Sequence, residues 1–127
     1  MATAKGRLMR SRFYIIPIFS LSILVGQLTF TAADIATSAD DAHSVFVADM
    51  DNDGDMDIVS ASSADNTIAW YENDGAANPS WTAADIATSA DGARSVFAAD
   101  MDNDGDMDIV SASYNDDAIA WYENTMD

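Results

Sequence analysis

The sequence predicts an all-β fold, made of two four-stranded antiparallel units that follow a short N-terminal signal helix. Three observations predict it. Residues 30–73 return almost unchanged as residues 81–124. Each copy contains short runs of β-branched and aromatic residues bounded by Asp, Asn, Gly or Ser, as strands are. The chain begins with a basic stretch followed by an apolar one.

The N-terminal element reads as an export signal. Four of the five basic residues lie ahead of residues 13–28, which are almost entirely apolar or small. A basic region before a short apolar region is typical of a secretory signal peptide. The apolar stretch contains Pro17 and is short for a membrane-spanning helix. We therefore assign residues 1–29 to a signal peptide, with an uncleaved signal anchor as the alternative, and expect a secreted or cell-surface protein.

The remaining chain, residues 30–127, divides into two repeats at 30–80 and 81–127. Four short strands per repeat correspond to one blade of a β-propeller. The alanine-rich start of each repeat could also be helical, but it shows no apolar period of 3.6 residues, so a strand is preferred. The expected strands cover residues 44–48, 58–62, 68–72, 95–99, 109–113 and 119–123, with residues 31–37 and 82–88 as a weaker fourth strand.

Two blades are too few to close a ring, so the sequence predicts an incomplete propeller. Residues 30–37 have the sequence of a fourth strand and precede the first blade, which leaves them free to complete the last one. Either several chains assemble, or this sequence is a piece of a longer propeller.

The charge of the chain is strongly negative and unevenly placed. It holds 22 Asp and Glu against 5 Lys and Arg, a formal net charge of −17. Every acidic residue lies at or beyond Asp34, where Arg94 is the sole basic residue. Such a surface repels nucleic acid and anionic membranes and suits multivalent cations, basic partners or salty surroundings. The chain has no cysteine, which excludes disulfides, zinc–thiolate sites and thiol catalysis.

One loop concentrates these carboxylates. Residues 49–57 read DMDNDGDMD and recur unchanged at residues 100–108, between the first two strands of each repeat. Like charges about 4 Å apart repel by about 1 kcal/mol even in bulk water, so an ordered loop of this kind needs a counter-ion. A hard cation with six to eight oxygen ligands fits the alternating carboxylates, and the glycine at position 6 permits the sharp turn. This pattern favours calcium over magnesium and zinc, with about two ions per chain.

The expected ligands are the side chains at positions 1, 3, 5 and 9 and the backbone carbonyl at position 7. They are Asp49, Asp51, Asp53, Asp55 (carbonyl) and Asp57 in the first loop, and Asp100, Asp102, Asp104, Asp106 (carbonyl) and Asp108 in the second. An EF-hand is excluded, because position 12 is Ser60 or Ser111 rather than glutamate.

The loop pattern D-x-D-x-D-G-x-x-D, a hydrophobic strand directly after it and then IAWYEN resemble the FG-GAP/VCBS repeat. This is the blade found in integrin α-subunit propellers and in many secreted bacterial proteins. The resemblance covers about residues 30–127. It implies a β-propeller fold, usually of seven blades, with calcium in the loop between the first two strands of a blade. It also implies the same ten aspartates as ligands.

These observations predict a calcium-binding, non-catalytic module for protein or glycan interaction or adhesion, outside the cell. His43, the single histidine, has Arg94 at its place in the second repeat, which argues against a catalytic histidine. The Trp-Tyr pairs at 70–71 and 121–122 are expected between blades, with sugar stacking as the alternative. Two rival functions remain: a fragment of a larger secreted enzyme acting on polysaccharide, and a two-blade chain that assembles into an oligomeric propeller.

Overall fold

The computed structural model describes residues 27–126, and residues 1–26 and 127 lie outside the description. The contacts divide the chain into two units, Met1–Thr31 and Ala32–Asp127, and the strands belong to the second. Of the predicted signal segment, residues 1–29, residues 1–26 lie outside the described residues. Within residues 27–126, no helix is long and apolar enough to cross a membrane.

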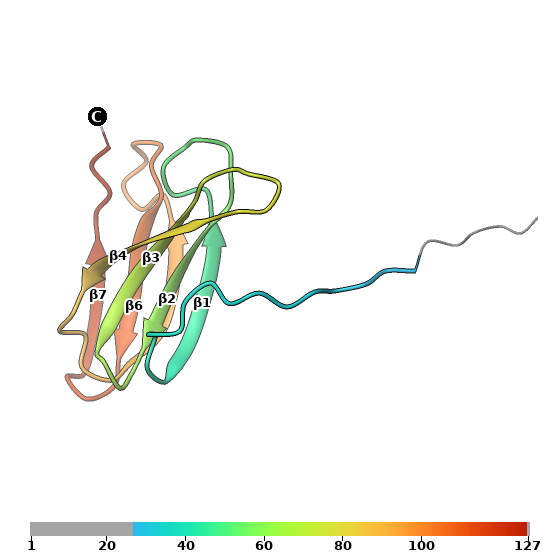
Figure 1. Ribbon diagram of the computed structural model, residues 1–127. Coiled ribbons are helices and arrows are strands. Elements are labelled where there is room, and N and C mark those ends of the chain that lie inside the picture. Colours follow the sequence, from blue (N-terminus) through green and yellow to red (C-terminus); the bar gives the residue numbers. More distant parts are fainter. Residues whose placement is uncertain (1–26, 127) are drawn as a thin grey trace, which may run out of the picture. The chain divides into compact units, whose positions relative to one another are not determined.

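The described strands form two antiparallel sheets, one with the order β1-β2-β3-β4 and one with the order β5-β6-β7 (Figure 1). The all-β prediction, with antiparallel sheets as incomplete propeller blades, is therefore confirmed. The strands are β1 Ala42–Ala48, β2 Asp57–Ser62, β3 Thr67–Asn73, β4 Trp81–Ala87, β5 Ala93–Ala99, β6 Asp108–Ser113 and β7 Ala118–Tyr122.

The two repeats fold alike because they share both their sequence and their turn chemistry. Ile58 pairs with Tyr71 in the first sheet, and Ile109 pairs with Tyr122 in the second. Both sheets carry a register shift near the start of their first strand. Each repeat therefore places its acidic loop at the same end of the same hairpin.

The expected fourth strand is found in one sheet and not in the other. β4 pairs with β3, but residues 31–37, which have the same sequence as residues 82–88, form no strand here. The prediction of two four-stranded units is wrong in this respect: the second sheet has three strands. Residues 31–37 pair with none of the described strands, whereas β4 pairs with β3.

The core lies between the two sheets, which pack against each other mainly through β1 and β2 on one side and β5 on the other. Its buried members are Ala48, Met50, Val59, Ala61, Ile68, Ala90, Ala93, Val96, Ala98 and Ile109. Trp70 packs against this cluster and Tyr71 is buried, as predicted. Trp121 is 50% exposed, contrary to the prediction, because no further sheet covers its face within the described residues.

Several differences between the repeats fall at turn residues with a positive φ. Asp41 and its counterpart Gly92 have φ values of 56° and 65°, and Asn66 and its counterpart Asp117 have 59° and 53°. Gly, Asn and Asp are the residues that adopt this left-handed conformation most readily. The exchanges therefore keep the backbone shape of the turns, which explains these differences without a binding role.

Candidate metal centre

The two acidic loops connect β1 to β2 and β5 to β6, as expected from the sequence. Their chain reversal depends on two left-handed positions: Asn52 and Gly54 have φ values of 60° and 96°, and Asn103 and Gly105 have 66° and 103°. A φ near 100° is strained for any residue with a Cβ, so glycine at position 6 is required by the backbone itself. The expected sharp turn is present in both loops.

Three predicted ligands of each loop converge. Asp49, Asp51 and Asp53 each offer a carboxylate oxygen, and these oxygens lie within 4.8 Å of one another. Asp100, Asp102 and Asp104 form the same arrangement in the second repeat. Three carboxylates at such distances are suited to holding one metal ion.

Backbone amides hold the carboxylates of the first loop in place. Asp49 Oδ2 accepts a hydrogen bond from the Gly54 N–H at 3.0 Å, and Asp53 Oδ1 accepts one from the Asp55 N–H at 2.8 Å. Asp49 Oδ1, in contrast, is buried and has no hydrogen-bond partner. A buried, unpartnered carboxylate oxygen is costly unless a cation or other donor meets it. This orphaned oxygen shows that the first loop fits a hard cation.

The electrostatics of the central carboxylates point the same way. Loss of solvation, together with the negative charges of Asp53, Asp57 and Asp49, raises the pKa of Asp51 above its ordinary value. Loss of solvation, together with neighbouring aspartates, also raises the pKa of Asp102. In both loops the ionised form of the central aspartate is therefore disfavoured, and a divalent cation would relieve that strain.

Asp57 and Asp108 have a different place in the structure. Both are fully buried at the first residue of β2 and β6, outside the convergent groups. Asp57 Oδ2 accepts a hydrogen bond from the Met50 N–H at 3.1 Å, and Oδ1 accepts one from the Asn73 N–H at 2.8 Å. Asp108 is bound in the same way in the second repeat. Position 9 of each loop is thus a clamp that ties the start of the loop to the end of the third strand.

Hydrogen bonds lower the pKa of Asp108 in the second loop. Burial by itself would raise the pKa of Asp108, but the N–H groups of Asn124 and Met101 and the side chain of Trp121 outweigh it, and the pKa lies below the ordinary value. The carboxylate therefore stays ionised although it is buried.

Asp55 and Asp106, expected to act through their carbonyls, also lie outside the convergent groups. The carboxylate of Asp106 accepts a hydrogen bond from Asn52 Nδ2 at 2.8 Å, which joins the two loops. The use of the carbonyls at this position, and of Asp57 and Asp108 as ligands, stays a prediction.

Comparison with known protein families identifies the repeated unit of this chain. The model of the FG-GAP-like repeat matches residues 20–60 and residues 49–111, which together cover well over half of the chain. The chain belongs to the FG-GAP-like repeat family. Searches of curated proteins and of solved structures found no match.

Two asparagines that fasten the loops of these FG-GAP-like repeats were given no role by the sequence analysis. Asn73 and Asn124 are the last letters of WYEN. Their backbone N–H groups donate hydrogen bonds to the buried clamp carboxylates, and their side-chain amides donate to backbone carbonyls of the loop. Asn124 Nδ2 also donates to the Met50 carbonyl of the other repeat at 3.0 Å. The signal was present, because WYEN is unchanged in both copies.

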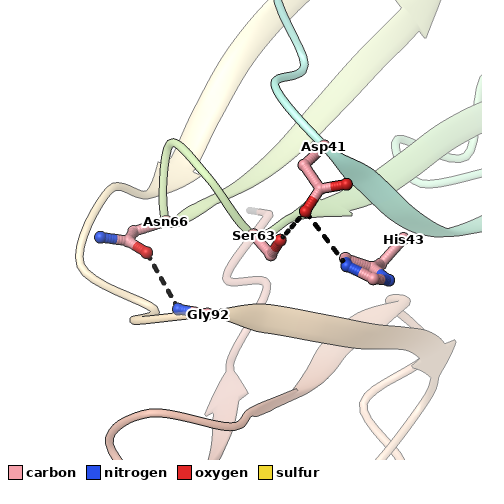
Figure 2. A network of polar contacts seen from close by, with 5 residues as sticks. All are labelled: Asp41, His43, Ser63, Asn66 and Gly92. Atoms are coloured by element: carbon pink, nitrogen blue, oxygen red, sulfur yellow. Dashed lines mark hydrogen bonds and ion pairs between the residues drawn. The ribbon is translucent and has the colours of Figure 1, made fainter.

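At the opposite end of the β1 hairpin, Asp41 accepts a hydrogen bond from Ser63 Oγ at 2.7 Å and lies 3.4 Å from His43 Nε2 (Figure 2). The Ser63 bond and the nearby His43 lower the pKa of Asp41. A hydrolytic triad needs histidine between serine and aspartate, whereas here aspartate is central. The second FG-GAP-like repeat replaces this group with Arg94 stacked 5.1 Å from the ring centre of Tyr114. Both arrangements fasten the same turn.

Proposed function

We propose that this chain is a calcium-binding, non-catalytic interaction module of the cell exterior, built from two FG-GAP-like blades. Each acidic loop would hold one calcium ion, so the chain would take up about two. The observation that carries this proposal is the convergence of Asp49, Asp51 and Asp53, together with the buried carboxylate oxygen of Asp49 that has no hydrogen-bond partner.

The chemistry of the donor set supports calcium among the common metals. All the convergent ligands are carboxylate oxygens, which suit hard cations. Calcium accepts irregular coordination by six to eight oxygens, whereas magnesium demands a strict octahedron and keeps several waters. Zinc prefers histidine nitrogen and cysteine sulfur as ligands.

The role of calcium in this proposal is structural. A bound ion would offset the repulsion among the three carboxylates and fix the turn between the first two strands of a blade. Binding to the folded state alone stabilises it by about 2.7 kcal/mol per site when free calcium is a hundredfold above Kd. For a domain near 100 residues, 1 kcal/mol moves Tm by about 4–8 °C, so a rise of 10 °C or more is expected.

The non-catalytic part of the proposal rests on how the titratable groups lie. An apolar cavity of about 230 Å³ between the sheets has Glu123 as the one carboxylate among its lining residues. Polysaccharide hydrolysis generally uses a pair of carboxyl groups across the scissile bond. The cluster around Asp41 has the wrong order for a nucleophilic triad.

Export and the choice of partner extend the proposal. The basic and apolar N-terminal segment supports secretion or display at the cell surface. A rigid, calcium-fixed blade presents its turns to an extracellular protein or glycan, because binding residues are commonly carried on loops of a rigid scaffold. Fractionation of expressing cells tests the export, and calcium-dependent retention on a glycan array tests the glycan.

The first experiment is calorimetric titration of calcium into the chelator-treated full-length chain. We expect saturation near two ions, with magnesium a much weaker competitor. A variant with Asp51→Asn and Asp53→Asn should retain one site, and so should a variant with Asp102→Asn and Asp104→Asn.

The matched control changes the same charge elsewhere. Asp85→Asn lies on an exposed part of β4 and should leave both sites intact. Weak, salt-like binding that none of the loop substitutions alters would overturn the calcium proposal. So would a Tm that is unchanged by excess chelator.

A further inference from the structure

The outer edge of the second sheet lacks the strand that covers the first. In the first sheet, β4 pairs along β3 from Ile68 to Asn73. In the second sheet, β7 is the last strand, and no strand among residues 27–126 pairs with its outer edge. An open edge of this kind exposes unpaired backbone N–H and C=O groups and readily accepts another strand.

The chain carries a second copy of the strand that would fit this edge. Residues 31–40 are identical to residues 82–91, which contain most of β4, and Phe30 stands where β4 begins with Trp81. In the structure this copy is extended chain without sheet pairing, and Phe30 is 89% exposed. The same sequence is thus a strand paired with β3 in one place and an unpaired segment in the other.

The two sheets pack together through one face of each, and the equivalent face on the other repeat is exposed in both cases. Ile68 of β3 is fully buried against the second sheet, whereas its counterpart Ile119 of β7 is 82% exposed. Val96 of β5 is 4% exposed on the other side of that contact, whereas its counterpart Val45 of β1 is 64% exposed. The chain therefore presents an apolar face and, on its other repeat, the face that fits it.

We propose that copies of this chain assemble head to tail, with residues 30–36 of one copy adding a fourth strand to β7 of the next. In this arrangement the Val45 face of the first copy covers the Ile119 face of the second, as Val96 and Ile68 meet within one chain. The register follows from the β3–β4 pairs moved by one repeat. It places Glu123 opposite Thr31, Trp121 opposite Ala33 and Ile119 opposite Ala36.

A hydrogen bond between the two repeats also has equivalent donor and acceptor residues at the two ends of the chain, where the proposed assembly would bring them together. Asn66 Oδ1 accepts a hydrogen bond from the Gly92 N–H at 2.9 Å, which fastens one repeat to the next (Figure 2). Asp117 stands at the place of Asn66 with the same left-handed backbone, and Asp41 stands at the place of Gly92. The Asp41 N–H of one copy is thus able to donate to the Asp117 carboxylate of the next.

The geometry also limits the size of the assembly. The contact joins two different faces, and such a contact forms a closed ring when the rotation between copies divides a full turn. Propellers commonly have about four to eight blades, and each copy supplies two. The expected products are therefore closed rings of two, three or four copies. This inference goes beyond calcium binding and stands if the loops bind no metal.

The first test measures the mass of the full-length chain by light scattering and native mass spectrometry, with calcium and with chelator. The chain has a mass of 13.6 kDa, and we expect a discrete species at two, three or four times that value. Ile119→Asp should weaken assembly by about 30-fold or more, because it buries a charge in the contact. Tyr114→Ser, which installs the residue of the first repeat at an exposed turn, should leave the mass unchanged.

The second test uses the fact that the chain has no cysteine. A variant with Thr31→Cys is mixed with a variant with Glu123→Cys under mild oxidation, and a covalent dimer containing one of each is expected. Replacing the second variant by Asp116→Cys, which lies out of register, should give far less. A monomer at all concentrations overturns the inference. So does an intrachain disulfide in the Thr31→Cys/Glu123→Cys double variant, because it places the strand on its own β7.

Discussion

Replacing Asp57 by asparagine should destabilise the protein in chelator as strongly as in calcium. The side chain is fully buried, and its two oxygens accept the N–H groups of Met50 and Asn73 at 3.1 and 2.8 Å. An asparagine amide has one acceptor oxygen, so its NH₂ group would face one of these N–H donors. One backbone donor is then left buried without a partner, in a clamp that closes the loop.

The cost follows from these two hydrogen bonds. A hydrogen bond to a charged group contributes about 1.5–3 kcal/mol, and a buried donor left unpaired costs about 1–3 kcal/mol. We expect the free energy of unfolding to fall by about 2–4 kcal/mol. With a urea m-value of about 1 kcal/mol per molar for a small domain, the midpoint should fall by about 2–4 M.

The assay is equilibrium urea unfolding followed by tryptophan fluorescence, run in excess calcium and in excess chelator. Asp85→Asn, an exposed substitution with the same change of charge, is the control and should shift the midpoint little. If Asp57 acted as a metal ligand alone, Asp57→Asn would be as stable as the unchanged chain in chelator. That result would refute the clamp.

Three further changes test other parts of the site. Asp51→Asn should stabilise the chelator-treated chain near neutral pH. Desolvation and neighbouring charges raise the pKa of Asp51, so its ionised form destabilises the folded state at pH 7. This destabilisation is lost as the pH falls through the raised pKa. Thermal unfolding from pH 4 to 7 checks it, and the gain over the unchanged chain should shrink toward pH 4. Gly54→Ala should cost about 1–2 kcal/mol through backbone strain alone, because φ is 96° and no atom lies within 4 Å of the added Cβ; urea unfolding measures it, and an unchanged midpoint contradicts it. Asn124→Ala should cost about 1 kcal/mol by leaving the Met50 carbonyl without its donor; urea unfolding with Asn73→Ala as the partner variant shows whether the link between repeats adds to the loss.

The strands and the loops could be predicted because local chemistry decides them. Short runs of β-branched and aromatic residues between Asp, Asn and Gly clusters set the strand positions, and Gly54 sets the turn of the loop. The role of Asp57 as a clamp could not be read from spacing, since its partners include Asn73 on a different strand. Likewise, no local pattern distinguishes residues 31–37 from residues 82–88, because pairing depends on which edge lies beside them.

The exposure of the second repeat follows the same logic. Trp70 and Trp121 sit in identical IAWYEN segments, yet one packs against the core and the other is half exposed. Sequence fixes which side of a strand a residue takes, whereas burial requires a neighbouring sheet. The family, the loops and the strand runs were therefore accessible from one repeat, and the burial of each face was not.

The shared register of the two sheets has a consequence for how such a chain can grow. The contact between repeats is made largely by residues present in both copies, such as Ile68, whose counterpart is Ile119, and Val96, whose counterpart is Val45. A duplication of one whole repeat would bring together the same two sheet faces that already pack in this chain, so it would create no new interface. Insertions of any other length would put strand and loop out of phase with the edge that receives them. Selection on this architecture would thus tolerate gain or loss of material in units of a complete blade.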